Sequence, residues 1–189
     1  MYYSRELCSL AFYERVFMKK CFVCLLLIAF NTVLFAQSLD EYANLISSGK
    51  CRESLPGLEK LSNSYAKQYG ATDTSHYALS LVYLMRTYNC LSMTREFENV
   101  CYTAKKVFES NDALMNTYYA EILHNLGILN EKSGNIQNAE LFYRQELLIK
   151  TKLYGSHHVS SVETLVTLGN FFKSISDFSQ SEQFFNDAF

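Results

Sequence analysis

Proline and glycine are scarce in this sequence, which holds one Pro and seven Gly among its 189 residues. Because average usage is about 5% Pro and 7% Gly, collagen-like, linker-like and turn-dense all-β structures are disfavoured. Charge of one sign is also lacking: 17 basic and 19 acidic residues give a net charge of −2, too little to attract nucleic acid or membrane phosphates strongly. Hydrophobic residues make up 49% of the chain and aromatic residues 15%. This composition indicates a single packed, helical domain rather than a disordered chain.

The N-terminal part has the outline of a secretory signal. A basic end at residues 18–20 precedes an apolar run over residues 21–35, and Ala36 then provides a small residue before a polar start. The run is shorter than the roughly 20 residues of a membrane-spanning helix. We therefore expect cleavage after Ala36 and export to the periplasm or the extracellular space; an inner-membrane anchor over residues 18–36 is the alternative. We also expect translation to begin at Met18, because 17 further residues ahead of the basic end are unusual for a secretory signal.

Cleavage would leave a mildly acidic chain. Removing four basic and two acidic residues leaves 13 basic and 17 acidic ones, a net charge of −4, which opposes nucleic-acid binding. Three of the six cysteines would remain, namely Cys51, Cys90 and Cys101. Three scattered thiols predict no disulfide framework, and the sequence leaves their redox state open.

Motifs for catalysis, metal binding or cofactor binding are not found. None of the four histidines stands in a metal-binding spacing, and so few glycines cannot build a phosphate-binding loop. We expect the adjacent His157 and His158 to be helix-entry residues. Cys101 could pair with a histidine as a nucleophile, but it falls on an apolar stripe, so an inert buried thiol is expected. The prediction is a protein without a metal, a cofactor or an active site.

A repeat of 42 residues dominates the rest of the chain. The motif Leu-x-x-Leu-Gly occurs twice; a small residue follows each glycine after twelve positions, and an aromatic residue comes four later. An earlier copy keeps the leucines but has Met, Phe and Cys at the other three places. Apolar residues at i, i+3, i+4 and i+7 predict amphipathic helices, and the small residues should let two helices approach closely. The copies are Leu81, Leu84, Met85, Phe97 and Cys101; Leu123, Leu126, Gly127, Ala139 and Tyr143; and Leu165, Leu168, Gly169, Ser181 and Phe185.

Turn and capping residues divide each copy into two helices. Gly134-Asn135 and Ser176-Asp177 predict tight turns between antiparallel helices. Capping boxes predict further helix starts, and the single proline should lie in the first turn of a helix that ends before Gly70. The residues in question are Ser160 with Glu163, Ser179 with Glu182, and Pro56.

This pattern resembles the tetratricopeptide repeat, and its period resembles the longer variant of kinesin light chains and their bacterial relatives. In that variant a Tyr-Gly-x-x-His linker joins the units. Residues 154–158 read Tyr-Gly-Ser-His-His, and Tyr69-Gly70 echoes the linker. HEAT-type repeats have a similar period of about 40 to 47 residues but lack the Leu-Gly punctuation. Met85 and Phe97 depart from the family pattern, and the family's tryptophans are missing.

The resemblance implies an all-α fold, a right-handed superhelix of stacked antiparallel helix pairs, or tetratricopeptide-like α-solenoid. The expected organisation is an N-terminal extension with the signal over 1–36, a degenerate first repeat and linker over 37–77, and three repeats over 78–189, of which the last is truncated.

The function implied is a non-catalytic scaffold that binds a peptide or helix in a concave groove. Chaperone-tail binding is not expected, because Ile128 stands where the family's carboxylate clamp needs Asn. Two alternatives stay open: the N-terminal regulatory array of a larger exported peptidase-type protein, and a membrane-anchored adaptor. The apolar stripe that ends at Phe189 indicates a partner, self-association or a truncated gene, of which truncation is favoured. Alignment with the family places Arg86, Asn89, His124, Ile128, Glu131, Asn170 and Lys173 in the groove.

Overall fold

The computed structural model describes residues 39–68, 74–111, 114 and 116–189. Contacts divide the chain into two units, Met1–Asn44 and Leu45–Phe189, and the repeats lie in the second. The expected signal over 1–36, the start at Met18 and the Tyr69-Gly70 echo lie outside the described residues. Residues 39–47 are helical. The further helices are α2 (Cys51–Gln68), α3 (Thr74–Cys90), α4 (Thr94–Glu109), α5 (Thr117–Lys132), α6 (Ile136–Tyr154), α7 (Val159–Ser174) and α8 (Phe178–Ala188).

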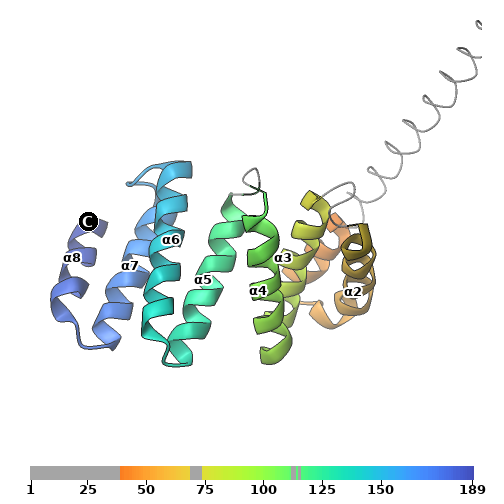
Figure 1. The fold of residues 1–189 in the computed structure, drawn as a ribbon, viewed down its shortest axis with the longest axis horizontal. Coiled ribbons are helices and arrows are strands. Elements are labelled where there is room, and N and C mark those ends of the chain that lie inside the picture. Colours follow the sequence, from red (N-terminus) through yellow and green to blue (C-terminus); the bar gives the residue numbers. More distant parts are fainter. Residues whose placement is uncertain (1–38, 69–73, 112–113, 115) are drawn as a thin grey trace, which may run out of the picture. The chain divides into compact units, whose positions relative to one another are not determined.

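Helices are the regular structure throughout the described ranges, and consecutive helices pack against each other from α2 to α8. Figure 1 shows them side by side in chain order, with successive helices running in opposite directions. The expected all-α fold of stacked helix pairs is confirmed. The helix pairs α3–α4, α5–α6 and α7–α8 correspond to the three copies of the 42-residue repeat. Within the part of the chain that the structure describes, no helix combines the length and apolar character needed to cross a bilayer.

The turn inside each pair recurs with the same period. Ser92, Gly134 and Ser176 each follow the first helix of a pair and adopt positive φ values of 57°, 74° and 65°. They lie 42 residues apart, so the left-handed conformation keeps the repeat register even where glycine is replaced by serine. Glycine adopts this conformation freely, whereas other residues carry a steric cost. The predicted turns at Gly134 and Ser176 are confirmed.

Three predicted helix starts are wrong by a few residues. Helix α7 begins at Val159, and His158 caps it by accepting a hydrogen bond from Ser160 N at 3.2 Å, so Ser160 is not the cap. Likewise Asp177 caps α8 by accepting from the backbone N–H of Gln180 at 3.1 Å, because a carboxylate two positions upstream outcompetes the expected Ser179. Helix α2 begins at Cys51, which places Pro56 in the second turn rather than the first.

The pairs α5–α6 and α7–α8 each close through a glycine on the first helix and an aromatic ring on the second. A Cβ added to Gly127 would lie 2.4 Å from the Tyr143 ring, and one added to Gly169 would lie 2.7 Å from the Phe185 ring. The Ser181 hydroxyl donates to the Gly169 carbonyl at 2.8 Å, which fixes the second crossing further. The close approach that the small residues predicted is confirmed.

In the first copy, the large and the small residue are exchanged between the two helices of the pair. Positions equivalent to glycine and the aromatic ring hold Met85 and Cys101, and both side chains are fully buried. A large residue on the first helix thus replaces a large residue on the second, which keeps the volume between the helices filled. The leucines of the motif also point inward: Leu126 and Leu168 are fully buried.

A disulfide joins Cys51 to Cys90 across 39 residues of sequence. Helix α2 begins at Cys51 and α3 ends at Cys90. The two helices contact each other, so their hairpin arrangement brings these ends together. The expectation that no disulfide framework follows from the three cysteines is therefore corrected. Spacing along the chain gave no signal for this pair, because only the folding of α2 onto α3 makes the two thiols neighbours.

Candidate functional site

Two hollows lie between the first helices of neighbouring copies. The hollow between α5, α6 and α7, here called the α5–α7 hollow, has a volume of about 290 Å³. The hollow between α3, α4 and α5, here called the α3–α5 hollow, has a volume of about 300 Å³. The α5–α7 hollow is lined by Thr117, Glu121, His124, Glu146, Lys150, Ser160, Glu163, Thr164 and Thr167. The α3–α5 hollow is lined by Tyr88, Asn89, Ser92, Met93, Thr94, Phe97, Asn125, Ile128, Leu129 and Lys132.

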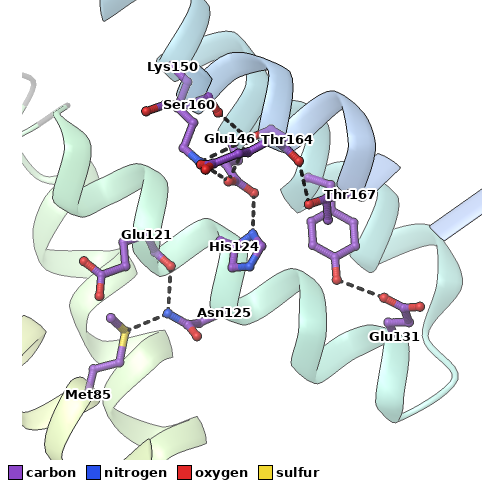
Figure 2. Close-up of polar contacts among 12 residues, drawn as sticks. Met85, Glu121, His124, Asn125, Glu131, Glu146, Lys150, Ser160, Thr164 and Thr167 are labelled. Atoms are coloured by element: carbon purple, nitrogen blue, oxygen red, sulfur yellow. Dashed lines mark hydrogen bonds and ion pairs between the residues drawn. The ribbon is translucent and has the colours of Figure 1, made fainter. Parts of the chain in front are cut away.

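A buried carboxylate organises the α5–α7 hollow. Glu146 lies on α6, and its side chain is 1% exposed. Its Oε2 atom lies 3.0 Å from Nδ1 of His124 on α5, and its Oε1 atom accepts hydrogen bonds from Lys150 Nζ at 2.7 Å and from Thr164 Oγ1 at 2.9 Å. Lys150 also donates to Thr164 at 3.1 Å. Figure 2 shows these side chains converging from three helices, so the network ties the second copy to the third.

The partners of Glu146 keep its carboxylate ionised. Burial disfavours the charged form, but the hydrogen bonds and positive charge supplied by His124 and Lys150 outweigh it and lower the pKa below the ordinary 4.5. An ionised carboxylate can only accept hydrogen bonds, so the His124 Nδ1 atom must carry the shared proton. In the neutral ring the other nitrogen, Nε2, is then an acceptor.

The first and second copies are joined by an ion pair between α3 and α5. Arg86 donates through Nε and Nη2 to the two carboxylate oxygens of Glu121, at 2.8 and 2.6 Å. Its guanidinium lies 5.5 Å from the centre of the Tyr83 ring and 5.6 Å from that of Tyr118. Hydrogen bonding to Glu121 raises the pKa of the Arg86 guanidinium, although partial burial opposes the shift. Both side chains stay about one third exposed.

The predicted groove residues fall into three groups. Arg86, His124 and Glu131 hold helices together; Glu131 accepts hydrogen bonds from the hydroxyl of Tyr143 at 2.9 Å and from that of Ser174 at 3.3 Å. Ile128 is partly buried against the core of the last two copies. The others are exposed. His124 lines one hollow, while Asn89 and Ile128 line the other. The exposed residues are Asn89, Asn170 and Lys173.

Sequence reasoning missed the second-helix contribution to this surface. It considered first helices only, and so overlooked Glu146 and Lys150 on α6. A signal existed: Glu146 follows Ala139, Phe142 and Tyr143 at helical spacing on the buried face of α6. A charged residue on such a stripe is rarely buried unless it is paired.

The remaining candidate groups for chemistry are structural. Cys101 is fully buried, and burial raises the pKa of its thiol to about 12, with Glu121 and Glu98 adding to the shift. The expectation that this thiol is buried is thus confirmed, and its raised pKa disfavours the reactive thiolate. His158 serves as a helix cap, as expected of a helix-entry residue. Across the ranges that the structure covers, no three His, Cys, Asp or Glu side chains gather closely enough to hold a metal ion.

Comparison with known proteins agrees with the repeat register. The profile of the tetratricopeptide repeat family matches residues 118–189. No curated protein sequence matches the chain at a significant level. Among solved structures, BtubC (BKLC) from P. vanneervenii is similar over 82% of this chain and 69% of its own, with a TM-score of 0.67 and 16% identity. A Podosopora anserina protein described as a kinesin light chain with nearly identical TPR-like repeats is similar over 81% of this chain and 72% of its own, with a TM-score of 0.66 and 15% identity.

Identities this low establish the fold and leave function to be argued from the site. The matched segment holds α5 to α8, the two copies in which glycine, small residue and aromatic ring all follow the family pattern. Residues 118–189 therefore match the tetratricopeptide repeat family, and the described part of the chain has the fold of kinesin light chain-like repeat proteins.

Proposed function

We propose that the protein is a non-catalytic interaction scaffold that binds a peptide or a helix across α3, α5 and α7. The observation that carries this proposal is the pair of hollows between these first helices, each of about 300 Å³ or slightly less. A hollow of this size accommodates one side chain of a bound segment.

The partners of the polar residues support binding rather than catalysis. Arg86, His124 and Glu131 are held by neighbouring helices through hydrogen bonds. Such anchoring makes the surface rigid, which lowers the entropic cost of holding a partner. Asn89, Asn170 and Lys173 are exposed on the same first helices and are available to hydrogen-bond a backbone or side chain.

We further propose that the protein is exported. The disulfide between Cys51 and Cys90 supports this proposal independently of the apolar run over residues 21–35, because disulfides persist in oxidising compartments. N-terminal sequencing of the protein from its own host tests it. A mature chain that begins at Gln37 supports export with cleavage, whereas a retained segment over residues 18–36 contradicts it.

Peptide selection against the purified full-length protein tests the scaffold proposal. Peptides enriched from a random display library are labelled, and their dissociation constants are measured by fluorescence anisotropy. Asn89→Ala and Asn170→Ala are each expected to weaken binding about threefold or more, since each removes one hydrogen-bonding group from the contact surface.

Asn99→Ala is the matched control, because Asn99 is an exposed amide on α4, a second helix. It should leave the dissociation constant unchanged. Photo-crosslinking of the same peptides should label α3, α5 and α7. Crosslinks confined to α4, α6 and α8, or an effect of Asn99→Ala equal to that of Asn89→Ala, would contradict the proposed surface.

A further inference from the structure

The α5–α7 hollow carries an excess of negative charge. Apart from His124, its lining holds three carboxylates, Glu121, Glu146 and Glu163, against the single ammonium of Lys150. That makes −3 plus 1, or −2. Counting Arg86, which pairs with Glu121 from outside the lining, leaves −1. Charges that line a hollow with low-dielectric walls focus their field into it.

Several donors of the hollow are already engaged. Lys150 donates to Glu146 and to Thr164, and the single hydroxyl proton of Thr164 lies within reach of Glu146 and of the Ser160 carbonyl. Thr167 donates to the carbonyl of Glu163 at 2.9 Å. His124 shares its Nδ1 proton with Glu146.

What remains for a ligand is an acceptor-rich wall. The Glu163 carboxylate is exposed, and the threonine hydroxyls keep lone pairs. A wall that combines spare acceptors with negative charge is complementary to a group that combines several N–H donors with positive charge. Glu146 and Thr164 are each about 1% exposed, so this wall is held rigidly from beneath.

We propose that the α5–α7 hollow is a subsite for a cationic side chain, a lysine ammonium or an arginine guanidinium, of the segment that the scaffold binds. The inference rests on the proposed function, because the bound segment supplies the cationic side chain. The groups that recognise this side chain are those that line the hollow. Glu163 is the residue that contacts the cation, and Glu146 positions His124 beside it.

The α3–α5 hollow provides an internal comparison. Its lining has no carboxylate and one cation, Lys132, beside amides and apolar side chains such as Phe97 and Ile128. The same cationic group should therefore avoid it. The two hollows together predict a bound segment with a basic residue over α5–α7 and a neutral or apolar residue over α3–α5.

Amide-resolved NMR titration of the full-length protein with small probes tests the inference. The probes are N-acetyl-lysine methylamide, its Nε-acetyl derivative, N-acetyl-arginine methylamide and N-acetyl-glutamate methylamide. The lysine or the arginine probe, or both, should shift amides around Glu163 and Thr164 at millimolar concentration, and the stronger of the two identifies the preferred cation. The Nε-acetyl and glutamate probes should shift them far less.

Glu163→Gln should weaken binding of the cationic probe about threefold, as expected for the loss of one partly exposed ion pair. Glu163→Lys should remove the amide shifts. Glu182→Gln, an exposed carboxylate on α8, is the matched control and should change nothing. Equal shifts from the lysine probe and its Nε-acetyl derivative, shifts centred on the α3–α5 hollow, the absence of any shift, or an equal effect of Glu182→Gln would each overturn the inference. If the selected peptides bind the first helices but contain no basic residue, only the cationic subsite is contradicted. If the cationic probe binds but no peptide is selected, only the scaffold proposal is contradicted.

Discussion

Replacing Gly127 by alanine is the sharpest test of how the helix pairs close. An added Cβ would lie 2.4, 2.6 and 2.8 Å from three atoms of the Tyr143 ring. That ring is 1% exposed, and its hydroxyl is held by Glu131 at 2.9 Å, so it cannot swing aside without losing a hydrogen bond. Either the ring or helix α5 must therefore move.

The magnitude follows from two opposing effects. Overpacking a buried site costs about 1–3 kcal/mol, whereas alanine in a helix interior gains about 0.5–1 kcal/mol over glycine. For Gly127→Ala we expect a net loss of about 1–2 kcal/mol in the free energy of unfolding. Gly169→Ala is the matched comparison. Phe185 is only partly buried and carries no hydroxyl, so it can rotate away, and the net change should be about 0.5 kcal/mol or less.

Urea unfolding followed by circular dichroism at 222 nm measures both variants. Gly127→Ala should lower the midpoint clearly more than Gly169→Ala. The first copy supplies a rescue, because Met85 and Cys101 occupy the equivalent places. Adding Tyr143→Cys to Gly127→Met should therefore restore part of the stability that Gly127→Met loses, giving a favourable coupling of about 1 kcal/mol. A Gly127→Ala protein as stable as the wild type would refute the reasoning.

Three further outcomes are expected. Because the folded-state pKa of Glu146 lies below its ordinary 4.5, the stability that Glu146 contributes is present above about pH 4.5 and is lost as the pH falls through the folded value. Glu146→Gln should cost about 3 kcal/mol at pH 7 and flatten the acid limb of a plot of urea midpoint against pH. Ser176→Gly, at a φ of 65°, should stabilise the protein by about 1 kcal/mol, and Gly134→Ala, at 74°, should destabilise it by a similar amount, both measured by thermal unfolding. Cys101 should escape iodoacetamide in the native protein and react after unfolding, as read by peptide mass spectrometry.

The elements could be predicted from the sequence because their signals are local. Helical spacing of Leu123, Leu126 and Gly127 depends on residues within two turns, and the 42-residue register then places the same pattern in the third copy. Errors were confined to boundaries. His158 and Asp177 cap their helices in place of the predicted serines, since several acceptors near a helix start compete for the same backbone N–H groups.

The candidate site was predicted only in part. The alignment placed His124 and Arg86 in the groove, and it did not predict that neighbouring helices engage both of them. Glu146 was not found, because its importance depends on groups supplied by two other helices.

The sequence by itself determined the helices, their pairing and the close contact between glycine and aromatic ring. Each of these features depends on the spacing of residues along one helix or two adjacent helices. Only the tertiary structure decided which side chains meet across copies. Cys51 reaches Cys90 over 39 residues, and Glu146 meets Thr164 over 18. Such contacts depend on how far each helix pair is turned relative to the next, and that rotation is set by packing of the whole stack rather than by any local pattern.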